Sequence, residues 1–294
     1  MHLEEGYYPV IPIHDELESA EGVGTKEKFW TRHNGVLCLV KFGRPTTGEN
    51  WAEKIACELC TLLALPHAHY DLATCGNQQC VLSPSMVEVG GRLALANEIM
   101  SSSRVSPDGT KIYRQREHTV SRSIAALTRF TDASVSIPQF IGYLMLDAWI
   151  GNTDRHNENW GILRNGTQRL AKIAPTFDHA SSLGRELTDE VRIERLKTKD
   201  ERYSVAAFTA KARSALYAEQ SDGRPLSPID AFALAGKAKK DGQAFWMAKL
   251  EAISEVEFEE VVDRIHPSFI TKSSADFAKQ ILKINREKIL ELKL

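Results

Sequence analysis

Short apolar runs bounded by turn-forming residues mark the N-terminal third of the chain. The run at residues 36–42 follows Asn34 and Gly35, and this arrangement predicts a strand that is entered from a turn. A second short run at residues 80–82 also predicts a strand. Residues 1–20 show neither pattern, so we expect them to form a loosely structured lead-in.

A helix is expected between these two strands. Apolar residues recur from Ala52 to Leu63 at the spacing of one helix face, so that face should be buried. Asn50 is expected to open the helix, and Glu53, three positions later, resembles the second member of a capping box. The helix should end before Pro66, because proline does not continue a helix.

From residue 93 onward the apolar spacing is mostly helical. One helix should cover residues 119–130, and another should begin at Pro138, because proline is favoured in the first helical turn. The expected buried stripe of this second helix is Phe140, Ile141, Leu144, Ala148 and Trp149. Further helices are predicted at residues 203–219, 228–250, 254–264 and 273–293, and a polar loop at residues 101–109.

The order of these elements predicts an α+β fold with two lobes. Strands and one helix come first and helices follow, as in a small β-rich lobe joined to a larger helical lobe. We place the N-lobe at residues 1–90 and the helical C-lobe, with its catalytic and metal-binding loops, at residues 91–294. The chain should cross between the lobes near Pro84 and Gly90.

Composition and charge exclude several classes of protein. The 294 residues are 43% hydrophobic and 26% charged with a net charge of −2, so there is no basic excess of the kind that marks direct nucleic-acid binding. No apolar run is long enough to span a bilayer, and the N-terminus lacks the features of a signal peptide. Five cysteines, an odd number, argue against a secreted disulfide framework. We therefore expect a cytoplasmic protein, or one delivered from a bacterial cytoplasm as an effector.

The strongest chemical signal lies in the segment that contains Asp154, Asn159 and Asp178. Phosphoryl transfer from ATP needs one carboxylate to orient the attacking hydroxyl, and an amide and a second carboxylate to hold magnesium. Asp154 suits the first role, while Asn159 and Asp178 offer the hard oxygen donors that magnesium prefers. The segment therefore predicts an ATP-dependent kinase with ATP and Mg²⁺ as cofactors. His156 has two interpretations: it orients the loop or contacts the transferred phosphate, or it is a structural histidine. The role of Arg155 is undecided as well.

Lys41 ends an apolar strand, where a lysine is unexpected unless its ammonium reaches an anion. We predict that it contacts the phosphates of ATP and pairs with a glutamate of the following helix. Glu53 and Glu58 lie on opposite flanks of the apolar stripe, so only one of them can face Lys41, and we prefer Glu53.

The other ATP-contacting residues are predicted on either side of this strand. Glycines let backbone N–H groups approach phosphate closely, and a nearby lysine or hydroxyl adds polar contacts. The predicted phosphate loop consists of Gly22, Gly24, Thr25 and Lys26. By their position Met86 and Val87 would line the adenine pocket, although ordinary packing between lobes explains them equally well.

Taken in order, these motifs resemble the HipA-like serine/threonine kinase family, in particular its compact members without an extra N-terminal subdomain. The resemblance runs from about residue 20 to residue 190 and rests on Gly-x-Gly-Thr-Lys-Glu-Lys-Phe-Trp at residues 22–30, Lys41, Trp51-Ala52-Glu53, Asp-Arg-His-Asn-Glu-Asn at residues 154–159 and Ala-Pro-Thr-Phe-Asp at residues 174–178. It implies a kinase that acts on serine or threonine of a protein, as a toxin or an effector. It also implies a possible small helix-turn-helix antitoxin as partner, and a self-phosphorylated residue in the glycine loop, for which Ser19 and Thr25 are both open.

Three alternatives remain. The Asp-Arg-His-Asn-x-Asn loop is also similar to that of phosphoinositide kinases, which would make the acceptor a lipid or another small molecule. A basic loop for an anionic headgroup would be expected in that case, yet residues 181–197 mix arginines with acidic residues. A kinase fold that only binds a nucleotide or a partner is a second alternative. A zinc-dependent hydrolase that uses Asp154, His156 and Asp178 is a third, although no His-x-x-x-His or equivalent ligand pair supports it. Separately, His67, His69, Cys75 and Cys80 could form a zinc site, although their spacing fits no standard zinc motif.

Overall fold

The computed structural model describes residues 6–14, 19–20, 27–100, 115–166 and 169–293, which form two compact units. Unit 1 comprises Met1–Met86, Asp178–Thr209 and Ile253–Ile284, and unit 2 comprises Val87–Phe177, Ala210–Ala252 and Asn285–Leu294. Each unit therefore combines segments that are far apart in the sequence. The division into an N-lobe at residues 1–90 and a C-lobe at residues 91–294 stays a prediction.

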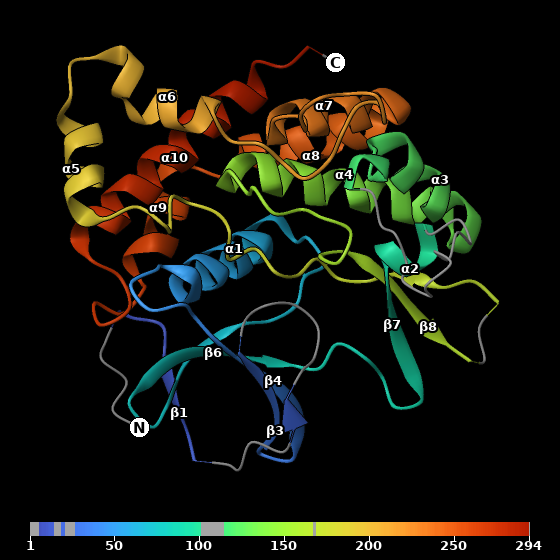
Figure 1. Cartoon of the computed structure of the whole chain (residues 1–294), viewed down its shortest axis with the longest axis horizontal. Coiled ribbons are helices and arrows are strands. Elements are labelled where there is room, and N and C mark those ends of the chain that lie inside the picture. Colours follow the sequence, from blue (N-terminus) through green and yellow to red (C-terminus); the bar gives the residue numbers. More distant parts are fainter. Residues whose placement is uncertain (1–5, 15–18, 21–26, 101–114, 167–168, 294) are drawn as a thin grey trace. The chain divides into compact units, whose positions relative to one another are not determined.

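Unit 1 is built on a mixed β-sheet with helices (Figure 1). Within the described residues the sheet has six strands in the order β1-β5-β6-β4-β3-β2, and all neighbours are antiparallel except β1 and β5. The strands are β1 (Val10–Ile13), β2 (Ser19–Ala20), β3 (Lys28–His33), β4 (Val36–Phe42), β5 (Asp71–Cys75) and β6 (Gln78–Pro84). The helices are α1 (Glu49–Leu63), α5 (Asp189–Lys197), the short α6 (Val205–Ala210), α9 (Glu255–Asp263) and α10 (Lys272–Leu290), of which α6 and α10 end in unit 2.

The strand that ends near Lys41 has the predicted bounds. Asn34 and Gly35 form the two-residue turn between β3 and β4, and both have the positive φ, 49° and 79°, that a type I′ hairpin turn requires. Val40 of β4 is fully buried in the sheet core. The expectation of a loose lead-in is wrong for residues 10–13, because β1 pairs with β5 and adds Ile13 to the same core.

Helix α1 packs against β5 and β6. It ends at Leu63 before Pro66, as predicted, with the next residue in the left-handed region. The predicted capping box is wrong, because Gly48 is the N-cap, no side chain caps the helix, and Asn50 lies inside it. A side chain at position 48 has no room, since a Cβ there would lie 2.1 Å from the indole of Trp51.

Unit 2 is arranged around one helix, α4 (Ala133–Ile150), which is buried from Phe140 to its end. Helices α3 (Val120–Phe130), α7 (Pro228–Ala238) and α8 (Lys240–Ala252) pack against it. The predicted start at Pro138 is wrong: Asp132 caps the helix by accepting from the Ser134 N–H at 2.9 Å. Pro138 is the sixth residue of α4, so the helix lacks one backbone hydrogen bond, the one that an N–H at this position would donate to the carbonyl of Ser134.

The remaining elements of unit 2 are short. A three-stranded sheet within the described residues has the order β7-β8-β9, formed by β7 (Gly91–Leu95), β8 (Gly161–Asn165) and β9 (Lys172–Ile173), with α2 (Ala96–Met100) directly after β7. This sheet was not predicted, and neither was α5. The helix predicted at 203–219 is present only as the short α6, and that predicted at 228–250 is divided into α7 and α8. The polar loop predicted at 101–109 lies outside the described residues. Among the residues that are described, no helix is long and apolar enough to cross a bilayer.

A buried histidine fixes the end of the loop that follows α4. The indole N–H of Trp160 donates to Nε2 of His118 at 2.9 Å, and Nδ1 of His118 lies 3.2 Å from the carbonyl of Ala215. Nδ1 must carry the proton for both bonds to form, so the ring is neutral. Burial lowers the pKa of His118 to about 3, and the nearby His156 and Arg155 act in the same direction.

This pKa predicts an acid-sensitive contribution to stability. Because the unfolded chain binds a proton near pH 6.5 and the folded chain only near pH 3, stability falls as the pH drops through this window, by up to about 1.4 kcal/mol per pH unit for this one group. In His118→Gln the free energy of unfolding, measured by urea denaturation between pH 4 and pH 6, should lose this part of its slope. His14→Gln, at an exposed position, serves as the control, and an unchanged slope in His118→Gln would contradict the assignment.

Candidate functional site

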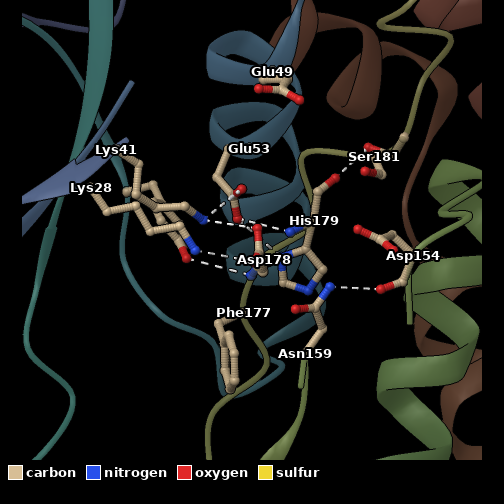
Figure 2. A network of polar contacts seen from close by, with 12 residues as sticks. Lys28, Lys41, Glu49, Glu53, Asp154, Asn159, Phe177, Asp178, His179 and Ser181 are labelled. Carbon is tan, nitrogen blue, oxygen red and sulfur yellow. Dashed lines mark hydrogen bonds and ion pairs between the residues drawn. The ribbon is translucent and has the colours of Figure 1, made fainter. Parts of the chain in front are cut away.

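Three charged side chains meet inside unit 1 (Figure 2). Nζ of Lys41, a residue only 5% exposed, lies 3.3 Å from Oε2 of Glu53 and 3.0 Å from Oδ1 of Asp178. Glu58 instead pairs with Lys54 at 2.6 Å, so Glu53 is the glutamate of α1 that faces Lys41. Strand β4, helix α1 and the segment after residue 177 each contribute one member of this cluster.

The three charges stabilise one another. Burial disfavours the charged form of Lys41, but Asp178 and Glu53 outweigh it and hold the pKa of Lys41 well above its ordinary value. Burial would raise the pKa of Glu53, but the Lys41 ammonium and a hydrogen bond from His179 hold it well below the ordinary value. Lys41 and Glu53 therefore stay ionised at neutral pH, and the Lys41 ammonium lies beside the partly exposed carboxylate of Asp178.

The backbone around Asp178 is held in an uncommon conformation. Asp178 has a φ of 60°, in the left-handed region where residues other than glycine are rare. Its N–H points to the phenol oxygen of Tyr70 at 3.4 Å, and the next N–H, of His179, donates to Oε1 of Glu53 at 2.9 Å. Nζ of Lys28 lies 3.8 Å from the second oxygen of Asp178. These contacts fix the direction of the Asp178 carboxylate.

In unit 2 the loop after α4 is organised by a buried ion pair. Arg155 is fully buried, and its Nε and Nη2 donate to the two oxygens of Asp147 at 2.7 and 2.8 Å. The same guanidinium donates to the backbone carbonyls of Asn159 and Phe177. Asn152 adds a bond to Asp147 at 2.8 Å. These contacts show that Arg155 has a structural role in the loop.

Polar contacts hold Asp154 within this loop, and one of them is with Asn159 (Figure 2). The Asp154 N–H donates to Oδ1 of Asn152 at 3.0 Å, while its side chain is 46% exposed. Nδ1 of His156 accepts from the N–H of Glu158 at 3.1 Å, and its Nε2 lies 3.6 Å from Oδ1 of Asp154. His156 is thus bonded to the loop backbone on one side and faces the Asp154 carboxylate on the other.

Asn159 in unit 2 and Asp178 in unit 1 each offer an oxygen donor of the kind that magnesium prefers. The amide nitrogen of Asn159 donates to the carbonyl of Asp154 at 2.7 Å, which directs its oxygen Oδ1 away from that bond as a ligand donor. Asp178 offers a carboxylate. Among the residues that the structure describes, no group of three or more His, Cys, Asp or Glu side chains could hold a metal, and this includes the cysteines and histidines considered for zinc. Magnesium in kinases, by contrast, is held by one or two protein oxygens together with the phosphates of the substrate.

The remaining residues that were expected to contact ATP stay predictions. The predicted phosphate loop, Gly22, Gly24, Thr25 and Lys26, lies outside the described residues. Met86 and Val87 lie between β6 and β7, and their contact with adenine stays a prediction. Asp147 was not predicted as part of the site, although a lone carboxylate in the apolar stretch of residues 140–150 is a signal that could have identified it.

The chain is similar in sequence or fold to two bacterial proteins. The chain is 27% identical over 194 residues to the serine/threonine-protein kinase CtkA of Helicobacter pylori, and this alignment covers 60% of the chain but only 56% of that protein. The crystal structure of a Helicobacter pylori proinflammatory kinase CtkA matches with a TM-score of 0.79 at 21% identity, covering 97% of this chain and all of the other. A complex of HipA, HipB and operator DNA from Shewanella oneidensis matches with a TM-score of 0.59 at 12% identity, covering 95% of this chain and 69% of that one.

These structural matches confirm the predicted α+β fold, with a sheet-rich N-terminal region and a mainly helical C-terminal part. The family is shown by a separate comparison. A family model described as the HipA-like C-terminal domain matches residues 19–235, and the chain, of which this is more than half, belongs to that family.

Proposed function

We propose that this protein is an ATP-dependent kinase that transfers the γ-phosphate to a serine or threonine hydroxyl of another protein. The observation that carries the proposal is the buried contact of Lys41 with both Glu53 and Asp178, together with family membership. A lysine held by a helix glutamate next to a metal-binding aspartate is the arrangement that kinases use to bind the phosphates of ATP. The similarity to CtkA, a serine/threonine-protein kinase, supports the same reaction.

Each polar residue has a role in this proposal. The Lys41 ammonium binds the phosphates of ATP, and Glu53 holds it in place. The Asp154 carboxylate orients the acceptor hydroxyl and accepts its proton, and His156, which faces it, keeps that carboxylate in position. Asn159 and Asp178 would hold magnesium, which when bound neutralises charge on the phosphates. The roles of Gly22 to Lys26, Met86 and Val87 remain as predicted above.

A protein acceptor is favoured over an anionic lipid by the basic residues after Asp178. Arg185 is paired with Glu49 at 2.5 Å, and Arg192 is paired with Asp189 at 3.0 Å. Arg195 lies over the ring of Tyr203, 4.1 Å from its centroid. These arginines are used in internal contacts, whereas binding of an anionic membrane needs basic groups that face the lipid.

Regulation and partners are proposed from the family alone. The HipA structure was solved with HipB and operator DNA, and a small helix-turn-helix protein is the corresponding partner that we propose here. Action as a toxin or an effector, and a cytoplasmic location, also stay predictions. Ser19 lies in β2 opposite Trp30, and its self-phosphorylation is untested, as is that of Thr25.

The function is tested by incubation with γ-labelled ATP and Mg²⁺, separately with a cell lysate and with phosphoinositide vesicles. We expect label on serine or threonine of a protein, and a loss of about 10²–10⁴-fold in Asp154→Ala, because general-base contributions are of that size. Binding of ATP should remain in this variant. Label on lipid alone would move the assignment to a lipid kinase. Equal labelling by wild type and Asp154→Ala would remove the proposed role of this residue.

Lys41 provides a test that combines stability with binding. Lys41→Met leaves Glu53 buried without its ammonium partner, so the free energy of unfolding should fall by about 3 kcal/mol, as is typical when one partner of a buried pair is removed. The double variant Lys41→Met, Glu53→Gln removes both charges and should recover part of this loss. Neither variant should bind ATP as wild type does. Tight ATP binding by the double variant, measured by calorimetry, would contradict the role of Lys41.

A further inference from the structure

The segment from Asp178 to Thr188 lacks helix and strand, yet much of it is buried. Ala180, Ser182 and Leu183 are at most 3% exposed. A buried irregular segment needs partners for its backbone and polar groups, because no regular hydrogen-bond ladder supplies them. These partners come mainly from the first turns of α1 and from α5.

Glu49, the first residue of α1, is the main partner. Its Oε1 accepts from Nη1 of Arg185 at 2.5 Å and from Nη1 of Arg44 at 3.1 Å, and its Oε2 accepts from the Arg44 N–H at 2.9 Å. The Glu49 side chain is only 2% exposed. The N–H of Gly48 donates to the carbonyl of Arg185 at 2.9 Å, so the backbone and the side chain of this arginine are both held at the helix N-terminus.

Arg185 also ties the segment to itself. Its Nη2 donates to Oγ of Ser181 at 3.2 Å, four residues earlier. From α5, Nη2 of Arg192 donates to the carbonyls of Gly184 at 3.0 Å and of Arg185 at 3.3 Å. Gly184 has a φ of 67°, and a Cβ there would lie 2.7 Å from the ring of Phe277, so the turn at this position requires glycine.

The same helix holds the start of the segment. Glu53 lies one turn after Glu49 and accepts from the N–H of His179, the residue after Asp178 (Figure 2). Helix α1 thus contacts the segment at its first residues through Glu53 and near its end through Glu49. Only six residues, 179–184, separate Asp178 from Arg185 in the sequence.

We propose that Glu49 and Arg185 are positioning residues for phosphoryl transfer. Their buried ion pair holds the segment after Asp178 against α1 and so fixes the direction of the proposed metal ligand. In many protein kinases the corresponding ordering needs an added phosphate that pairs with arginine. Here the carboxylate of Glu49 supplies the negative charge from within the chain, so the segment is ordered without such a modification. This inference rests on the proposed kinase function.

The test compares Arg185→Ala with Arg44→Ala. Both remove a guanidinium from Glu49, but Arg44 is half exposed and position 44 keeps its backbone bond to Glu49. In Arg185→Ala we expect kcat to fall by about 10²-fold and the half-saturating Mg²⁺ concentration to rise, because misplacement of a catalytic group by about 1 Å has effects of this size. In Arg44→Ala both quantities should stay within about threefold of wild type.

Glu49→Gln and the double variant Glu49→Gln, Arg185→Ala complete a cycle. If the two residues act through one contact, the double variant should be no less active than Arg185→Ala alone. Arg185→Lys keeps the positive charge, so it should have a higher kcat than Arg185→Ala. It cannot bond Glu49 and Ser181 in the same way as arginine, so its kcat should stay below that of wild type. Additive losses in the double variant would overturn the shared role.

A second measurement does not depend on activity. Amide hydrogen exchange should become faster at residues 178–188 in Arg185→Ala and stay unchanged there in Arg44→Ala. Unchanged exchange in Arg185→Ala would overturn the tether, and faster exchange with wild-type kcat and Mg²⁺ dependence would overturn the positioning role. If wild type transfers no phosphate at all, it is the kinase proposal that fails, and exchange still decides whether Glu49 and Arg185 hold the segment.

Discussion

The buried ammonium of Lys41 is the constraint on which unit 1 depends. A lysine this deep in a protein is strongly unfavourable unless anionic partners surround it. Glu53 and Asp178 supply them, and each comes from a different element, so the sheet, α1 and the segment after residue 177 must assemble together for the charge to be buried. The stability of the fold and the geometry of the site therefore rest on the same contacts.

Unit 2 contains a buried ion pair of its own. There the buried charge is the guanidinium of Arg155, and Asp147 of α4 neutralises it. The remaining donors of Arg155 hold backbone carbonyls on either side of β8 and β9, including that of Phe177, the residue bonded to Asp178 in the chain. In both units a buried ion pair sets the backbone, while the groups proposed for chemistry, such as Asp154, stay partly exposed.

Sequence patterns predicted those features that are local in the chain. Strand β4 was predicted with its bounds because Asn34-Gly35 is a strong turn signal, and the end of α1 because Pro66 limits it. Features that depend on tertiary contacts were missed. Strand β1 has too few residues for a clear pattern, and the capping box failed because the Glu53 carboxylate is taken by Lys41 and His179.

The same distinction holds for the site. Spacing in the sequence predicted that Lys41, Asp154, Asn159 and Asp178 act as a set, but it left Glu53 and Glu58 as alternative partners of Lys41. Only packing of α1 decides between them, and it directs Glu58 to Lys54 instead. The role of Arg155 was also open, because nothing in the sequence beside Asp154 indicates that this arginine is fully buried. Glu49 and Arg185 are 136 positions apart, so no local pattern could pair them.

The most direct test of the central claim measures, by calorimetry, how tightly a non-hydrolysable ATP analogue binds at increasing Mg²⁺ concentrations. The proteins compared are wild type and Asp178→Asn. Asp263→Asn, which changes a carboxylate that is 60% exposed, is the matched control. The account predicts that Mg²⁺ tightens binding of the analogue to wild type and to the control, and that this effect is lost in Asp178→Asn while the analogue still binds. The same Mg²⁺ dependence in all three proteins would contradict it.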